Sequence, residues 1–309
     1  MDYVVLAYYF FTPIEDPEQE VKRHKEFLKD RDIKCRIYFS HEGMNGQTSA
    51  SLEAAQEYME WMHSDPRFAK MEFKLHRYPE HAFAKATVKV REQIVALDVP
   101  VDLEKGGEHV SPEQWAKMLD EKDANTLVLD VRNDYESAIG HFSGAYCPKL
   151  ETFRQFPKLA EDLKKEYDPT KTRVMMYCTG GIRCEVYSAL MKDIGFHNVY
   201  QLDGGVIRYG EKMGSKHWDG KLFVFDDRLS VPLTEEDPGT VISTCAHCDA
   251  PTDTYLNCAH MDCNALFLAC PECAKRLKGC CSKECTKAER VREFDSTERP
   301  KPYRKLRES

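Results

Sequence analysis

The stretch Met175–Glu185, MMYCTGGIRCE, places a cysteine where an apolar run ends and a glycine-rich turn begins. Residues 173–177 have the length and apolar content of a short buried strand. Residues 185–194 have apolar side chains at the spacing of an amphipathic helix. Cys178 is therefore expected at the carboxyl end of a strand, in a loop that leads to a helix N-terminus. Because loop N–H groups and the helix dipole favour an anion there, we expect a thiolate nucleophile.

The loop from Cys178 to Arg183 reads CTGGIR, with four residues between the thiol and the arginine. Cysteine phosphatases have a comparable loop that is one residue longer and encloses a phosphoryl group. The shorter loop suits a single sulfur atom, or a similarly small group, on the thiolate. Arg183 is expected to fix the loop or to balance the charge of an anionic persulfide. The loop residues expected to support this site are Thr179, Gly180 and Gly181. A structural cysteine beside a Gly-Gly turn is the less favoured interpretation, and Cys184 is either a resolving thiol or a core-facing helix residue.

The composition is that of a soluble globular protein of two or three domains. The chain has 309 residues, of which 42% are hydrophobic and 31% charged, and its net charge is −8. No apolar run approaches the ~20 residues of a membrane span, and the acidic N-terminus does not resemble a signal peptide. We therefore expect a cytoplasmic protein whose nucleic-acid contacts, if any, form a local patch.

The thirteen cysteines are unevenly distributed, with nine of them between Cys245 and Cys285. This pattern favours a reducing compartment and a local metal site over a disulfide-rich secreted protein. Two C-x-x-C pairs separated by 21 residues, with further cysteines between them, are typical of zinc. The ligands predicted for two structural zinc ions are Cys245, Cys248, Cys270 and Cys273 for the first, and Cys258, Cys263 and two of Cys280, Cys281 and Cys285 for the second, with Cys281 and Cys285 chosen. His247 and His260 are alternative ligands. Free thiols, disulfides and a redox role are less favoured.

The first hundred residues alternate between strand and helix patterns. The expected strands are 3–11, 34–39, 43–50 and 71–77, and the expected helices are 16–29 and 52–63. The order β-α-β-β-α-β is that of a ferredoxin-like sandwich, with two helices on one sheet. The segment HEGMNGQTSA has glycines at 43 and 46, which allow a tight backbone path beside a ligand, although a hairpin turn is the favoured interpretation.

Residues 80–106 are expected to be a connector with one or two strands. Beyond it, Ser111, Pro112 and Gln114 form a capping-box pattern at a helix start. The elements that follow are strands 126–131, 173–177 and 199–202, and helices 134–138, 153–167, 185–194 and one from about 206. This alternation predicts a parallel sheet with helices on both faces, where ligands bind beyond the carboxyl ends of the strands. The fold class is thus α/β and α+β, with domains 1–100, 101–220 and 221–309.

The segment LVLDVRNDYESAIGHFSGA, residues 127–145, resembles the first signature of the rhodanese domain. That resemblance implies that Asp130, Arg132 and Glu136 hold loops in place and that His141 is structural rather than catalytic. The later segment LDGGVIRYGEKMG resembles the closing rhodanese element.

Three motifs in order, EGMNGQ, CTGGIRCE and GKLFVFDDR, resemble the tRNA uridine hydroxylase family over nearly the whole chain. The resemblance implies oxygen-dependent 5-hydroxylation of the wobble uridine, with dioxygen as co-substrate and the anticodon region of tRNA as partner. It also implies that Cys178 is the essential cysteine, described as persulfide-forming. The alternatives are a thiosulfate- or persulfide-dependent sulfurtransferase and a non-catalytic binding module.

The residues do not themselves predict how dioxygen is activated. The sequence has no convincing facial triad and no flavin or nicotinamide fingerprint. The tail 297–309 has five basic and two acidic residues and is either a solvated tail or an RNA contact.

Overall fold

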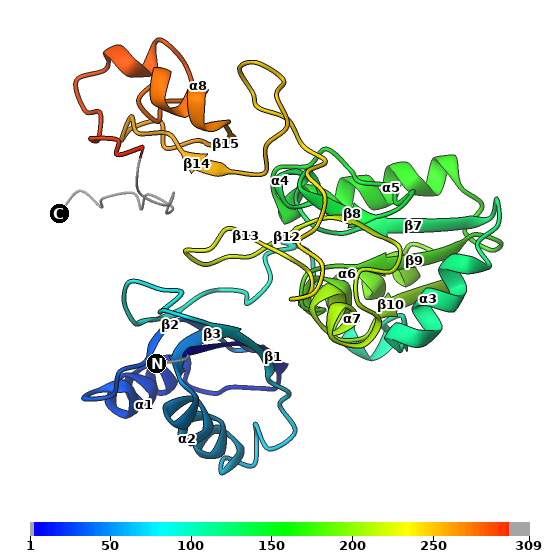
Figure 1. Ribbon diagram of the computed structural model, residues 1–309. Helices are drawn as coiled ribbons and strands as arrows, with labels where there is room; N and C mark the ends of the chain where they lie inside the picture. The colour runs from blue at the N-terminus through cyan, green and yellow to red at the C-terminus, as the bar shows by residue number, and fades with distance from the viewer. Residues whose placement is uncertain (1–2, 297–309) are drawn as a thin grey trace.

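The N-terminal part of the protein is a five-stranded sheet with two helices on one face (Figure 1). The computed structural model describes residues 3–296. The elements are β1 (Tyr3–Phe11), α1 (Pro17–Leu28), β2 (Lys34–Ser40), β3 (Gly43–Ser51), α2 (Leu52–His63), β4 (Lys74–Tyr78) and β5 (Thr87–Val90). The sheet order β4-β1-β3-β2-β5 contains the ferredoxin-like order in its first four members, which confirms the predicted sandwich. Strand β4 begins later than predicted, and β5 extends the sheet by pairing in parallel with β2.

The two faces of this sheet have different roles because side chains alternate along each strand. Tyr8 faces the helices, where its hydroxyl lies 2.8 Å from both the Thr48 hydroxyl and the Tyr58 hydroxyl. Gly46 lies opposite Tyr8, and a Cβ on this glycine would be 2.5 Å from the Tyr8 ring. The neighbouring residue Tyr9 points to the other face, which neither helix covers. Residues 43–51 are therefore a central strand rather than a simple hairpin turn.

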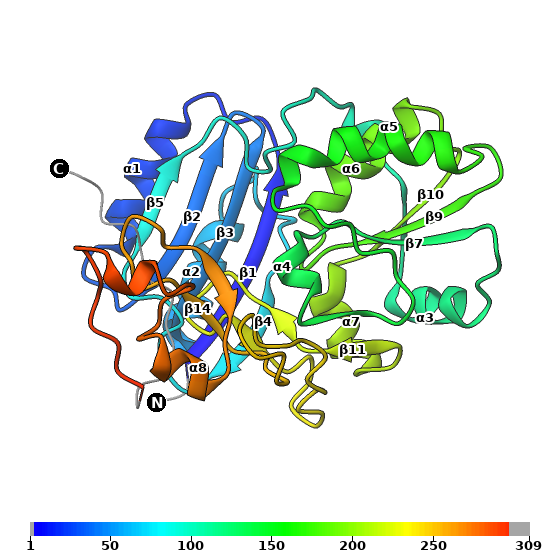
Figure 2. The same ribbon diagram turned by 90° about the horizontal axis from the view of Figure 1, so that it is seen from above.

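The middle of the chain forms a parallel four-stranded sheet of order β6-β10-β9-β7. Its elements are β6 (Glu108–Val110), α3 (Pro112–Asp120), β7 (Thr126–Asp130), α4 (Asp134–Ser137), β8 (Gly140–Phe142), η2 (Phe153–Gln155), α5 (Phe156–Glu166), β9 (Arg173–Tyr177), α6 (Ile182–Asp193), β10 (Asn198–Leu202), α7 (Gly205–Met213) and β11 (Trp218–Gly220). Helices α5 and α6 cover one face and α3 and α7 the other (Figure 2). This arrangement confirms the predicted rhodanese-type α/β layers.

Local sequence explains the start of α3 but not that of α6. Ser111 and Gln114 form the predicted capping box, with the Gln114 N–H donating to the Ser111 hydroxyl at 3.2 Å. Helix α6 begins at Ile182, three residues before the predicted start at Glu185. The N-cap of α6 is Gly181, which has no side chain to mark a helix start, and this explains the error.

The C-terminal part has little regular structure. It contains β12 (Leu222–Phe223), β13 (Ser230–Val231), β14 (Tyr255–Asn257), β15 (Leu266–Leu268), α8 (Pro271–Arg276) and η3 (Cys285–Lys287). Strands β14 and β15 form a short hairpin beside α8 (Figure 1). The predicted basic tail, residues 297–309, lies outside the described residues. None of the helices within residues 3–296 has the length and apolar character needed to cross a bilayer.

Replacement of Gly46 by alanine tests the packing of the N-terminal sandwich. We expect Gly46→Ala to lower the free energy of unfolding by about 1–3 kcal/mol, because the new methyl group overlaps a buried ring. The matched control is Gly180→Ala, whose methyl group would have its nearest neighbour, Lys74 Nζ, at 4.0 Å. This control should change stability by less than about 0.5 kcal/mol. Denaturant unfolding measures both, and equal stability of the two variants would contradict the packing argument.

Candidate active site

Cys178 lies directly after β9, at the carboxyl edge of the parallel sheet, as the sequence predicted. Its sulfur accepts a hydrogen bond from the Gly181 N–H at 3.1 Å. The carbonyls of Cys178 and Thr179 accept hydrogen bonds from the N–H groups of Val206 and Ile207, at 3.0 and 3.1 Å. These bonds occupy the loop carbonyls, so the first turn of α7 helps to hold the cysteine loop in shape.

Close packing between the loop and α7 requires a glycine. A Cβ on Gly205 would lie 2.6 Å from the carbonyl oxygen of Cys178, and the backbone φ of Gly205 is +68°. Both constraints exclude an ordinary side chain. The Gly-Gly turn before α7 is therefore a structural part of the cysteine loop.

The environment of Cys178 stabilises a thiolate. Burial by itself would raise the pKa of this thiol, but four groups act in the opposite direction. The Cys184 thiol donates a hydrogen bond to the Cys178 sulfur, and the Arg183 guanidinium contributes positive charge. The backbone N–H groups of Arg183 and Gly181 also donate hydrogen bonds to this sulfur. Together these groups lower the pKa of Cys178 to about 5. Burial and the neighbouring Cys178 raise the pKa of Cys184 well above its usual value, so Cys184 remains a thiol donor. The surroundings of Cys178 thus favour the thiolate over the thiol.

Arg183 is held by a buried carboxylate. Its two terminal nitrogens lie 2.5 and 2.8 Å from the two oxygens of Glu136, which is in α4. The Thr179 hydroxyl donates to the same carboxylate at 3.1 Å. Burial would raise the pKa of Glu136, but the Arg183 charge and hydrogen bond outweigh it and lower the pKa. Arg183 therefore fixes the loop and also contributes charge near the sulfur.

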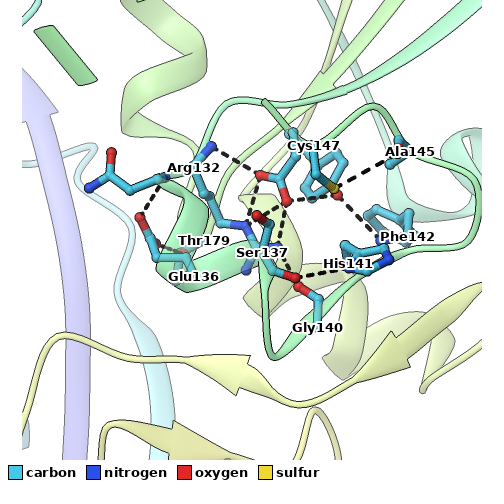
Figure 3. A network of polar contacts seen from close by, with 12 residues as sticks. Arg132, Glu136, Ser137, Gly140, His141, Phe142, Ala145, Cys147 and Thr179 are labelled. Atoms are coloured by element: carbon cyan, nitrogen blue, oxygen red, sulfur yellow. Dashed lines mark hydrogen bonds and ion pairs between the residues drawn. The ribbon is translucent and has the colours of Figure 1, made fainter. Parts of the chain in front are cut away.

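A second buried arginine supports the segment that carries Glu136. The Nε and Nη2 atoms of Arg132 donate to Asp130 at 2.9 and 2.6 Å, and Nη2 also donates to the Gly140 carbonyl at 2.6 Å (Figure 3). The Tyr177 hydroxyl donates to Asp130 at 2.9 Å and connects β9 to the same group. His141 Nδ1 lies 2.9 Å from the Ser137 carbonyl (Figure 3). These contacts place Asp130, Arg132 and His141 in the scaffold of the loop.

The N-terminal sheet contacts the cysteine loop directly, which sequence reasoning missed. The ammonium group of Lys74 in β4 is buried and donates to the Gly180 carbonyl at 2.6 Å. The hydroxyl of Tyr9 in β1 donates to Glu185 at 2.9 Å, in the first half of α6. Lys74 and Tyr9 resemble ordinary strand residues in the sequence, so no local pattern separates them from others.

A cavity of about 410 Å³ lies between the uncovered face of the N-terminal sheet and the cysteine loop. It is lined by residues from all three motifs of the sequence: Asn45, Gly46 and Gln47 from the first, Cys178, Thr179, Gly180, Ile182 and Arg183 from the second, and Phe225 from the third. Further lining residues include Tyr9, Arg36, Tyr38, Lys74 and Phe153. Such a volume is within the range of small-molecule sites, about 300–1,000 Å³. Cys178 therefore borders a space of suitable size for a small molecule.

The C-terminal cysteines form two groups of potential metal ligands. The sulfurs of Cys245, Cys248, Cys270 and Cys273 lie within 4.8 Å of one another, as do those of Cys258, Cys263, Cys281 and Cys285. Because the pairs alternate along the chain, the arrangement is cross-braced. Cys280 is outside both groups, with its thiol 3.8 Å from the Lys278 carbonyl. His247 and His260 also lie outside them: one packs against Phe267 and the other lies 3.6 Å from Asp262.

The fold and the loop define a class: a rhodanese-type domain with a reactive cysteine, joined to a ferredoxin-like domain. Family descriptions agree, since residues 3–94 match the UPF0176 acylphosphatase-like domain, 111–212 the rhodanese-like domain and 219–286 the rhodanese C-terminal region. The chain is 54% identical to the tRNA uridine(34) hydroxylase of Protochlamydia amoebophila (strain UWE25), over 98% of this chain and 94% of that one. It is 52% identical to the protein of the same name from Chlamydia felis (strain Fe/C-56), over 99% and 94%. The chain therefore belongs to the tRNA uridine(34) hydroxylase family, as its motifs predicted.

Among solved structures, the chain is similar to the rhodanese-like domain of an Anabaena protein. The TM-score is 0.31 at 18% identity, over 36% of this chain and 78% of that domain.

Selective alkylation tests the state of Cys178. We expect brief treatment with iodoacetamide to modify Cys178 faster than Cys35 or Cys147, whose pKa values burial raises to about 11 and about 12. Its rate should be half-maximal near pH 5, because the reactive thiolate is lost as pH falls through that value. Proteolysis and mass spectrometry report the order in which the three cysteines are alkylated. The Cys178→Ser variant identifies the peptide that contains Cys178. Slowest labelling of Cys178 in the folded protein would refute the thiolate.

Proposed function

We propose that this protein hydroxylates C5 of the wobble uridine of tRNA in a dioxygen-dependent reaction, with Cys178 as the essential residue. The observation that carries the proposal is the cavity in which an anionic Cys178 faces the polar side of the N-terminal sheet. The relatives are named tRNA uridine(34) hydroxylase, which supports hydroxylation of that uridine. A sulfurtransferase function is not favoured, because those relatives share nearly the whole chain. The substrate also implies a cytoplasmic location and contact with the anticodon region.

The anionic sulfur gives this reaction a chemical starting point. A thiolate can add to C6 of uracil, forming an S–C6 bond and moving the C5=C6 electron pair toward C5 and O4. The resulting enolate is nucleophilic at C5 and can form a C5–O bond with dioxygen. Two electrons and two protons from an external reductant then cleave the O–O bond and release water. Loss of the C5 proton and of the sulfur restores the double bond and the thiolate.

The same loop suits the persulfide that the family resemblance implies at Cys178. Its N–H groups and Arg183 stabilise negative charge on sulfur. Persulfide formation at Cys178 would take a sulfane sulfur from a donor such as thiosulfate, which leaves as sulfite, whereas the hydroxylation steps above use the unmodified thiolate. The loop is formed by Thr179, Gly180 and Gly181, and Thr179 binds Glu136. The segment that carries Glu136 is in turn held by the contact between Arg132 and Asp130.

Nucleoside analysis of tRNA tests the proposed reaction. In a host strain without other routes to 5-hydroxyuridine, the wild-type protein should produce 5-hydroxyuridine-derived nucleosides. Cys178→Ser should reduce them at least about 100-fold, because a hydroxyl group is not ionised at neutral pH. Cys147→Ser is the matched control, since Cys147 lies outside the cavity. Mass spectra that are the same with and without the wild-type protein would rule the proposal out.

We also propose that the two cysteine groups bind structural zinc. Four thiolates in a compact cluster are the donor set that zinc prefers in structural sites. The surrounding segment contains short strands and one short helix, so metal binding would contribute much of its folding energy.

Elemental analysis provides a matched test of the ligand assignment. Protein purified without added metal should contain two zinc ions per chain. Cys281→Ser should remove one of them, whereas the adjacent Cys280→Ser should retain both, because Cys280 is outside the clusters. Chelation should unfold the segment that carries the clusters. Structural zinc would be refuted if the wild-type protein contained less than about a tenth of a zinc ion per chain and kept its fold on chelation.

A further inference from the structure

We infer that the uncovered face of the N-terminal sheet is the base pocket, and that Arg36 and Gln47 select uracil by contacting its O4 and N3–H edge. This inference rests on the proposed function, because it names the residues that recognise its substrate. The reacting sulfur belongs to the rhodanese-type domain, so recognition and chemistry would come from different domains.

Strand register places the recognition groups side by side. Arg36 on β2 is directly opposite Gln47 on β3, and Tyr38 is opposite Asn45 two residues along. Gln47 is also opposite Ala7 on β1, whose small side chain leaves the amide uncovered on that side. Residues opposite one another on antiparallel strands have their Cβ atoms about 4.5–5.5 Å apart. The guanidinium and the amide therefore form one polar row on the cavity wall.

The three cations of the cavity differ in their availability. Lys74 is bound to the Gly180 carbonyl, and Arg183 to both oxygens of Glu136. Arg36 donates one N–H to the Phe225 carbonyl at 2.9 Å, which positions the guanidinium and leaves other N–H donors. Among residues 3–296, no hydrogen bond to the Gln47 side chain is formed. Arg36 and Gln47 are thus the pair best placed to bind a ligand.

This pair matches uracil better than cytosine. A guanidinium can only donate, and it suits the O4 acceptor of uracil. Cytosine has an amino donor at the same position, which would face the donors of Arg36. The Gln47 carbonyl can accept from N3–H of uracil, whereas cytosine has an unprotonated N3. Mismatched polar groups in a desolvated pocket are costly, so the pair would discriminate against cytosine.

Aromatic rings supply the remaining walls. The Arg91 guanidinium lies 4.9 Å from the centre of the Tyr38 ring and covers one face of it. Tyr38 lines the cavity, as do Phe153 and Phe225, and these rings offer surfaces on which a base can stack. Arg91 is exposed and can contact a phosphate beside the inserted nucleotide. The pocket is therefore suited to a single base turned out of the anticodon loop.

Binding of two RNAs by the full-length, zinc-loaded protein tests this assignment. The probes are anticodon stem-loops that differ only in uridine or cytidine at the wobble position, and anisotropy gives the dissociation constants. We expect the wild-type protein to prefer the uridine RNA by about 10–100-fold. Arg36→Met and Gln47→Leu should each reduce this preference below about threefold, and thermal unfolding confirms that both variants are folded at the assay temperature. Gln56→Leu is the matched control, because Gln56 lies on the exposed surface of α2.

The outcomes separate this inference from the proposed function. Equal binding of both RNAs by the wild-type protein, or an unchanged preference in both folded variants, would overturn the base pocket. If the wild-type protein selects uridine through these residues but forms no 5-hydroxyuridine, the pocket is supported and the proposed reaction is refuted. If 5-hydroxyuridine forms and both variants retain full activity and selectivity, the reaction is supported and the pocket is refuted.

Discussion

The guanidinium of Arg183 and the carboxylate of Glu136 are buried together behind the cysteine loop. Each would be costly to bury alone, and removing one partner from such a pair typically costs about 3–5 kcal/mol. Their two short contacts join the first turn of α6 to α4, and the Thr179 hydroxyl binds the same carboxylate. Because Arg183 is fixed, its charge stays close to Cys178 and helps to lower the pKa of the thiol. The reactivity of the sulfur therefore depends on a pair that does not itself need to react.

The second determinant of the site is the contact between the ferredoxin-like domain and the rhodanese-type domain. A rhodanese-type loop on its own has an anionic sulfur beyond the edge of a sheet, a geometry that suits sulfur transfer. Here Lys74 and Tyr9 attach the uncovered face of a ferredoxin-like sheet to that loop. The resulting cavity lies beside the sulfur and has polar and aromatic walls. In Figures 1 and 2 the two domains lie side by side. The cavity is lined by residues of both.

The C-terminal part has two physical roles. Its first segment reaches the cavity, because Phe225 lines it. The Phe225 carbonyl also accepts the hydrogen bond that positions Arg36. Its second segment has only a small apolar core, which includes Leu256, Ala269 and Ala274, and the two cysteine clusters lie beside it. The Tyr255 hydroxyl donates to the Tyr135 carbonyl at 2.6 Å and attaches the cysteine-rich hairpin next to α4. The segment thus contacts the element that carries Glu136.

The sequence alone determined the features that depend on residues close together in the chain, such as secondary structure, helix caps and the cysteine loop. Periodicity and caps predicted the ferredoxin-like order, the parallel sheet and the Ser111 capping box, and the contiguous loop identified Cys178 as a thiolate. Cysteine spacing predicted both clusters, and the structure has Cys281 and Cys285, rather than Cys280, in the second. Only the tertiary structure decided which strand residues line the cavity, because the sequence pattern of β2 does not distinguish Arg36 from other strand residues. Packing one domain against another places that residue in the same cavity as Cys178. No local pattern in the sequence indicates that two segments so distant in the chain lie together.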